Sequence, residues 1–218
     1  MRFSMCVAAL AVCLFGQTAF AALAITEVAS TSGATELELA GLDWWELTNS
    51  GPGSVLLDGY EWEDNNPTGF GNDTAAFPSG ITISDGESVI IHEGDATVPA
   101  AFRTVWGLSP SVQILSEDLF GGNNTFSGLS SGGDQVRVYN SIGTQIALVN
   151  FGAATPGVSF EWNTSGVSLG LSVDGQFGAH TASNGRVGSP GIAVPEPAAI
   201  ALVGLAVCGL AGCVRRRK

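Results

Sequence analysis

The stretch "LSSGGDQVRVYNSIGTQIALVNFG", residues 129–152, contains two runs in which apolar side chains recur with the short period of a β-strand. "QVRVY" begins at Gln135 and "TQIALVNF" begins at Thr144. The four residues between them, "NSIG", have the composition of a tight turn. The stretch therefore predicts a β-hairpin.

Similar short segments, separated by Gly, Asn, Asp and Pro, occur on both sides of this hairpin. In "YEWE", from Tyr60, two aromatic residues alternate with two carboxylates, which places the two kinds on opposite faces of a strand. Further strands are predicted at "ELEL" (36–39), "WEL" (45–47), "SVIIH" (88–92) and "VQIL" (112–115). The exception is "PAAFRTVW" (99–106), which predicts a helix because Pro suits a first helical turn and Phe102 and Trp106 share a face. The pattern is typical of an all-β sandwich or barrel.

The order of these pieces resembles a lamin-tail domain, an immunoglobulin-like β-sandwich. The residues that carry the resemblance are "AITEVAS", "DWWELTNSG", "VLLDGYEWED", "FPSGITISDGESVII", the helix with "LSP", the 129–152 stretch, "GVSFEW" and "GSPG". We therefore assign residues 25–191 to one such domain. Long polar loops at 64–73 and 117–128, and the stretch after Trp162, depart from the family pattern. The resemblance implies a scaffold or adhesion role and supplies no catalytic residue.

Residues 1–24 have the layout of a secretory signal peptide. Arg2 precedes an apolar run at 5–15, and small residues follow at cleavage spacing, which makes Ala21 and Ala24 the candidate cleavage positions. The alternative is an N-terminal membrane helix, but the run is shorter than the roughly 20 residues that a crossing needs.

Residues 192–218 combine the motif Pro195, Glu196, Pro197 with an apolar run at 198–214 and a basic end. As a helix, the apolar run would be about 25 Å long, which is just enough to cross a bilayer. The basic end would hold the chain terminus on the cytoplasmic side; it consists of Arg215, Arg216, Arg217 and Lys218. These physical arguments alone are also consistent with a permanent membrane anchor.

The same three parts resemble the PEP-CTERM sorting signal of Gram-negative bacteria that produce exopolysaccharide. The resemblance implies that an exosortase processes the tail. The helix would then be a transient anchor, and the mature protein would pass to the cell surface or the medium.

Charge and cysteine are distributed unevenly along the chain. Between residues 25 and 194 three Arg face 19 Asp and Glu, a net charge of −16. Such an acidic segment would repel a phosphate backbone, so nucleic acid is not an expected partner. All four Cys lie in the two terminal apolar runs, which leaves no disulfide or thiolate metal site for the domain.

Two features could bind a ligand. The loop "EWEDNNPTGFGND" offers hard oxygen ligands for Ca²⁺, although a solvated turn is the favoured interpretation; the candidate ligands are Glu63, Asp64 and Asp73. Trp45 and Trp62 are predicted in the core, whereas Trp44 points to the opposite strand face and is the candidate for stacking on a sugar.

No catalytic site is predicted. G-x-S-x-G occurs twice, centred on Ser130 and Ser168, and Asp174 and His180 follow the second in hydrolase order. That motif needs a helix after the Ser, and "LGLSVDGQFGAH" is not helical. His92 and His180 are the only His, and we expect both at the surface, too few for a zinc site.

The sequence therefore predicts a secreted or surface-sorted structural or adhesive protein of the bacterial envelope or matrix, not an enzyme, with no required cofactor. The expected partners are the secretion machinery, an exosortase, the membrane through the C-terminal helix, and exopolysaccharide or envelope proteins. The alternatives are an exopolysaccharide-binding module, with or without Ca²⁺, and more remotely a serine hydrolase.

Overall fold

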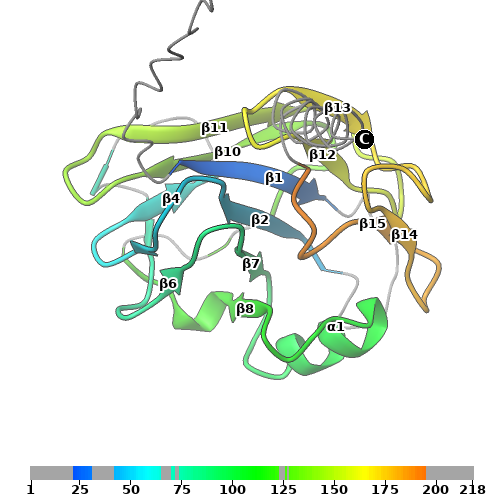
Figure 1. Cartoon of the computed structure of the whole chain (residues 1–218), viewed down its shortest axis with the longest axis horizontal. Helices are drawn as coiled ribbons and strands as arrows, with labels where there is room; N and C mark the ends of the chain where they lie inside the picture. Colours follow the sequence, from blue (N-terminus) through cyan, green and yellow to red (C-terminus); the bar gives the residue numbers. More distant parts are fainter. Residues whose placement is uncertain are drawn as a thin grey trace, which may run out of the picture.

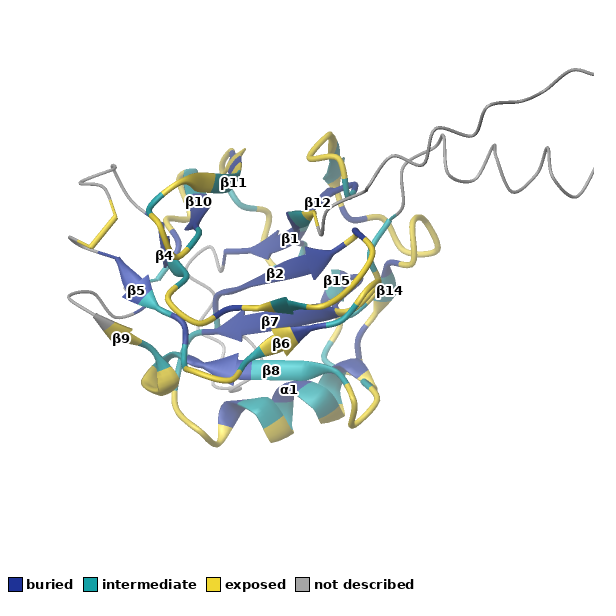
Figure 2. Cartoon of the chain, turned by 60° about the vertical axis from the view of Figure 1, so that its left-hand side comes forward, coloured by how far each residue is buried: buried dark blue, intermediate teal, exposed yellow. Residues whose placement is uncertain are grey.

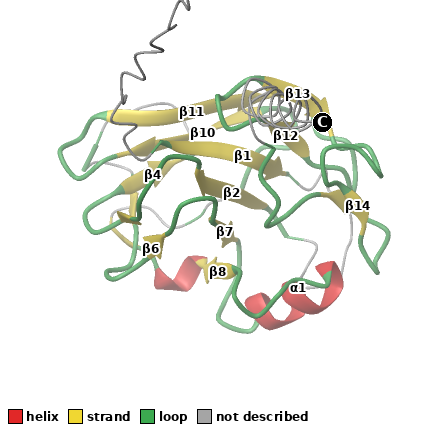
Figure 3. Ribbon diagram, in the orientation of Figure 1, coloured by secondary structure: helices red, strands yellow, loops and turns green. Residues whose placement is uncertain are grey.

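The hairpin predicted around "NSIG" is confirmed. β10 (Asp134–Tyr139) pairs antiparallel with β11 (Gln145–Phe151), and the Gly143 N–H donates to the Asn140 carbonyl at the tip. The computed structural model describes residues 22–30, 42–64, 70–71, 74–122, 126 and 128–194. This part of the chain is mostly β (Figure 3).

The remaining elements follow the predicted strands closely and add several short ones. They are β1 (Leu23–Ala29), β2 (Trp44–Asn49), β3 (Val55–Leu56), β4 (Glu61–Glu63), β5 (Ala75–Ala76), β6 (Thr82–Ile83), β7 (Ser88–His92), α1 (Val98–Trp106), β8 (Gln113–Ser116), a 3₁₀ helix (Glu117–Leu119), β9 (Gly121–Gly122), β12 (Phe160–Trp162), β13 (Ser168–Leu171), β14 (His180–Thr181) and β15 (Val187–Gly188).

Two sheets face each other (Figure 1). The six-stranded sheet has the order β13-β12-β1-β2-β7-β8, and the five-stranded sheet has the order β11-β10-β4-β5-β9. Two short ladders, β14 with β15 and β3 with β6, complete the described strands. The arrangement confirms the predicted β-sandwich. Its strand pairs are antiparallel except β7 and β8, which run parallel because α1 forms the crossover between them.

The main core lies between the two sheets. Trp45 and Trp62 are buried there as predicted, with ring centroids 5.1 Å apart. Apolar side chains at alternating strand positions surround them; they include Val28, Leu47, Val89, Ile91, Val136, Val138 and Val149. The apolar residues that alternate along the sequence are therefore the ones whose side chains fill this core.

A second apolar layer covers the outer face of the six-stranded sheet. The helix α1 begins with Pro99 in its first turn and ends at Gly107, whose φ of 65° is left-handed. Its side chains Phe102 and Trp106 pack on Trp44 of β2, with ring centroids 5.4 and 6.0 Å away. Because both faces of the central strands are covered, β2 and β7 are buried along their whole length (Figure 2).

This second layer overturns two predictions. Trp44 is fully buried and offers no face to a sugar, since α1 covers it. His92 is also fully buried, and its ring lies edge-on to Phe102 at 4.9 Å. Burial lowers the pKa of His92 to about 4, so the ring is neutral at physiological pH.

The stretch after Trp162 contributes to the same sandwich. β13 extends the six-stranded sheet, and β14 and β15 form a small ladder next to α1, where the His180 ring contacts Trp106. Within the described ranges, no helix has both the length and the apolar character that a membrane crossing requires. The predicted strand at 36–39 and the predicted helix at 198–214 lie outside the described residues.

Candidate functional site

Three buried glutamates lie side by side on the outer face of the six-stranded sheet. Glu27 of β1 is level with Glu161 of β12 on one side and with Glu46 of β2 on the other. All three residues are at most 2% exposed. β1 contains a β-bulge at Thr26. Between Ile25 and Glu27 the chain of β1 advances by two residues while its partner β2 advances by one.

The glutamates bind a segment that we call the C-terminal strap, residues 188–194. The Ser189 N–H donates to Glu27 Oε1 over 2.8 Å, and the Ser189 hydroxyl donates to Glu27 Oε2 and Glu161 Oε1 over 3.2 and 3.0 Å. The Gly191 N–H donates to Glu46 Oε2. Each of the three carboxyl groups thus holds one or more donors of the strap.

The strap approaches the sheet closely at Gly188. A Cβ atom at this position would lie 2.5 Å from Glu27 Oε1 and 2.9 Å from the Ser159 hydroxyl oxygen, closer than van der Waals contact allows. A larger residue at this position would therefore displace the Glu27 and Ser159 side chains from the hydrogen bonds that they make here. The predicted "GSPG" end of the domain is therefore the point at which the chain is fastened to its own sheet.

Hydroxyl groups of the sheet donate further hydrogen bonds to the three carboxyl groups. Thr26 donates to Glu46 Oε1 over 2.6 Å, Ser159 donates to Glu27 Oε1, and Ser172 donates to Glu161 Oε1 over 2.9 Å. No Arg or Lys of the described chain forms an ion pair with these three carboxyl groups. The cluster is therefore hydrogen-bonded but not neutralised by a cation.

Burial raises the pKa of Glu27 well above its ordinary value, and the neighbouring Glu46 and Glu161 raise it further. Burial also raises the pKa of Glu46 and of Glu161. Carboxyl groups that share a buried site in this way retain protons that exposed ones release. Because the strap covers the three carboxyl groups, we interpret them as hydrogen-bond acceptors that hold the strap on the sheet.

The strap ends beside the sheet. Val194 forms a parallel bridge with Asn163, and the Thr164 N–H donates to the Val194 carbonyl over 3.0 Å. The predicted sorting residues Pro195, Glu196 and Pro197 come next in the chain and lie outside the described residues, as does the basic end. The Pro195-Glu196-Pro197 motif thus follows directly on Val194, the last residue that the structure describes.

The two candidate signal-cleavage positions differ in their surroundings. Ala24 lies within β1, is buried, and pairs with Thr48 of β2. Ala21 lies outside the described residues, one position before Ala22, whose carbonyl accepts a hydrogen bond from the Ser50 N–H.

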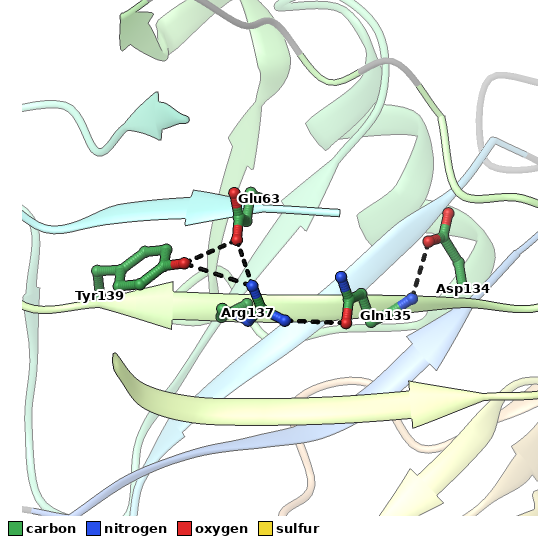
Figure 4. A network of polar contacts seen from close by, with 5 residues as sticks. All are labelled: Glu63, Asp134, Gln135, Arg137 and Tyr139. Carbon is green, nitrogen blue, oxygen red and sulfur yellow. Dashed lines mark hydrogen bonds and ion pairs between the residues drawn. The ribbon is translucent and has the colours of Figure 1, made fainter. Parts of the chain in front are cut away.

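The three candidate Ca²⁺ ligands have different surroundings, and Figure 4 shows those of Glu63. Glu63 of β4 is in a buried ion pair with Arg137 of β10, 2.7 Å apart, and accepts a hydrogen bond from the Tyr139 hydroxyl. Asp64 is buried, and Asp73 lies outside the described residues. In the parts of the chain that the structure describes, no group of three or more His, Cys, Asp and Glu could hold a metal ion.

Neither G-x-S-x-G match forms the strand–turn–helix that a nucleophile needs. Ser168 begins β13, and Ser130 precedes a turn that leads into β10. His180 lies in β14, where its Nε2 contacts the Trp106 carbonyl at 3.3 Å.

Sequence analysis missed the three buried glutamates. A signal for them exists, since each is a single acid inside a run that becomes a strand: "ITEVA", "WWELT" and "SFEWN". Alternation assigns such an acid to the face opposite the core. It does not say that this face is covered as well.

Comparisons with known protein families agree with this architecture. A Lamin Tail Domain model matches residues 16–153, and a PEP-CTERM protein-sorting motif matches residues 193–218. No curated protein matches the chain. The sorting-motif match begins within the strap, one residue before Val194. The Lamin Tail Domain match covers more than half of the chain, and the chain therefore belongs to the Lamin Tail Domain family.

Proposed function

We propose that this protein is exported, sorted through its C-terminal segment and processed by an exosortase, and that its β-sandwich then acts as a non-catalytic structural or adhesive part of the cell envelope or extracellular matrix. One observation carries the proposal: a PEP-CTERM sorting motif matches residues 193–218, so that it begins within the strap that is hydrogen-bonded to the sandwich. A sorting motif of this kind is a recognised exosortase substrate signal and implies a surface or extracellular location.

A Lamin Tail Domain and a sorting motif together point to a non-enzymatic structural protein. The buried Glu27, Glu46 and Glu161 support the same conclusion, because the strap that covers them would keep a substrate from their carboxyl groups. We further propose that the apolar run at 198–214 anchors the protein in the membrane only until it is processed.

Exopolysaccharide and other envelope proteins are the proposed partners. Burial of Trp44 removes the aromatic candidate for sugar stacking, and the ion pair of Glu63 with Arg137 engages one of the candidate Ca²⁺ ligands. We therefore favour the scaffold over a carbohydrate-binding module with or without Ca²⁺.

The test compares the wild-type chain with a Pro195→Ala, Glu196→Ala, Pro197→Ala variant in a bacterium that carries an exosortase. Pro52→Ala, in the exposed loop before β3, is the matched control. Mass spectrometry should find wild-type and control protein at the surface or in the medium with a C-terminus near Pro195. The motif variant should remain in the membrane fraction with Lys218 intact. Surface-exposed wild-type protein that retains Lys218 would contradict processing.

The scaffold role needs a separate experiment. Purified protein is incubated with the producer's own exopolysaccharide and with its isolated envelope. Retention by the envelope without saturable binding to the free polysaccharide supports a scaffold. Saturable binding to the polysaccharide would favour the carbohydrate-binding module instead.

A further inference from the structure

A groove runs between the first half of β1 and the strand β11. It has a volume of about 310 Å³, and its lining includes Leu23, Ile25, Ile146, Val149 and Thr164. A second cavity of about 640 Å³ shares Leu23 and Ile146 with it and extends the groove to Leu56 and Tyr60. The groove is therefore lined mostly by apolar residues, has exposed polar surface as well, and has an aromatic ring at one end.

Both sides of the groove are strand edges without a ladder partner among the described residues. β1 pairs with β2 along its length but with β12 only at Glu27 and Val28, so residues 23–25 have one open edge. β11 pairs with β10 alone. The two strands contact each other without pairing. Open edges present backbone N–H and C=O groups that can bind an extended segment.

Val194, the last residue that the structure describes, lies near the end of this groove. Along the continuation of β12, the Asn163 N–H bonds to Val167 on the β13 side, whereas the next N–H, that of Thr164, bonds to Val194. Because successive N–H groups of an extended chain point in opposite directions, Val194 lies on the side of β1. Its bridge to Asn163 is parallel and β12 is antiparallel to β1, so the chain beyond Val194 is aimed along β1 towards Leu23.

We propose that residues 195–198 dock in this groove as an extended segment, antiparallel to β1. Four extended residues reach about 13 Å, enough to run from Thr164 along the groove. Pro195 and Pro197 favour extended backbone, so docking would cost them little conformational entropy. Segments of this kind bind apolar grooves that contain aromatic rings, as Tyr60 provides here. The contact is intramolecular and belongs to the chain before its tail is cleaved, because cleavage near Pro195 would remove most of the docked segment. Docking itself requires no processing.

Disulfide cross-linking of the full-length chain tests the contact. Cys6, Cys13, Cys208 and Cys213 are first replaced by Ser, and Ala198→Cys is combined with Ile146→Cys in the groove. The matched control combines Ala198→Cys with Ile142→Cys at the tip of the same hairpin, 81% exposed and outside both cavity linings. The Ile146 pair should form an intramolecular disulfide at least tenfold faster than the control. Equal rates, or disulfide-linked dimers that place the tail in a second copy, would overturn the proposal.

Hydrogen exchange on the chain without engineered Cys provides a second test. Replacing residues 195–198 by Gly-Ser-Gly-Ser should speed amide exchange at 23–25 and 146–149 at least tenfold. Exchange in β7, inside the six-stranded sheet, should not change, which checks that the variant is folded. Unchanged exchange along the groove would overturn the docking even where export and processing proceed normally.

Discussion

The cluster of Glu27, Glu46 and Glu161 places three carboxyl groups in an environment that disfavours their charged form. Burial raises the pKa of each, and for Glu27 the two neighbouring carboxylates add to the effect. Hydroxyl and amide donors from Ser159 and Ser189 offset part of this cost. The arrangement therefore holds the strap most firmly when at least one carboxyl group is protonated.

Glu27→Gln should remove a pH dependence of stability. The unfolded chain releases the Glu27 proton near pH 4.3, whereas the folded protein keeps it to higher pH. The stability that Glu27 contributes is therefore fully present below about pH 4 and is lost as pH rises through the folded pKa. Each unit of difference between the folded and unfolded pKa values changes the free energy of unfolding by about 1.4 kcal/mol. Urea unfolding should show the variant similar to wild type at pH 4.5 and more stable by about 1 kcal/mol or more at pH 8.

Glu87→Gln is the control, because Glu87 is exposed and the substitution removes the same charge. It should leave the shape of the pH profile of the unfolding free energy unchanged. A Glu27→Gln profile that runs parallel to that of Glu87→Gln would mean that Glu27 is ionised in the folded protein, contrary to the expectation.

Arg137→Met should destabilise the domain by leaving the Glu63 carboxylate without its cation. Arg137 and Glu63 are both buried on the outer face of the five-stranded sheet, and the Tyr139 hydroxyl would remain as a neutral donor to Glu63 (Figure 4). We expect a loss of about 2–3 kcal/mol in the unfolding free energy, measured by urea titration at pH 7. The double variant Glu63→Gln, Arg137→Met should recover part of it. A double variant less stable than Arg137→Met alone would contradict this account.

The position at which the predicted signal peptide is cleaved would decide where β1 begins. Its first residues, Leu23 and Ala24, pair with Asn49 and Thr48 of β2, and the Ala22 carbonyl accepts from Ser50. Cleavage after Ala24 would remove these pairings and one wall of the groove between β1 and β11. Cleavage after Ala21 would keep them all.

We therefore expect the mature protein to begin at Ala22. N-terminal mass spectrometry of the exported protein measures this directly. A chain that begins at Ile25 should, if produced, melt at a lower temperature, because it loses two residues of a central strand. Exported protein that begins at Ile25 with an unchanged melting temperature would contradict the expectation.

The crossover from β7 through α1 to β8 creates the second covered face of the sheet. The helix carries Phe102 and Trp106 one turn apart, and both are buried against Trp44 and Ile90. An element that lies on the outer face in this way turns an ordinary sandwich strand into one that is buried on both sides. This is why β2 and β7 tolerate no exposed side chain.

The surface charge of residues 25–194 is almost entirely negative. Three Arg oppose 19 acids between residues 25 and 194, and two of them, Arg137 and Arg186, are buried. Raising NaCl from 10 to 150 mM should therefore raise the melting temperature by roughly 3 °C, because salt screens the repulsion between carboxylates. Differential scanning calorimetry measures the shift.

Ca²⁺ should stabilise the domain only through ionic strength. At equal ionic strength, CaCl₂ and MgCl₂ should stabilise the domain equally, since Glu63 is engaged by Arg137. An additional increase of the melting temperature with millimolar Ca²⁺ alone would support the Ca²⁺ site considered for the loop at 61–73.

The features that could be predicted from sequence are those that depend on neighbours along the chain. The hairpin of β10 and β11, the helix at 99–106 and the burial of Trp45 and Trp62 were all predictable. Turn composition and the alternation of apolar side chains encode them locally. The C-terminal sorting motif could be predicted for the same reason, since its order of motif, apolar run and basic end is a linear signal. The signal peptide at 1–24 stays a prediction.

The covered outer face of the six-stranded sheet could not be predicted in this way. Alternation shows that Trp44, Glu46 and His92 point away from the main core, but that pattern looks the same whether the second face meets water or another layer. The layer comes from α1 and from the strap, which lies 145 residues beyond Glu46 at Gly191. Burial of those side chains, the raised pKa values of the glutamates and the groove beside β1 therefore arise only when distant segments meet in the folded chain.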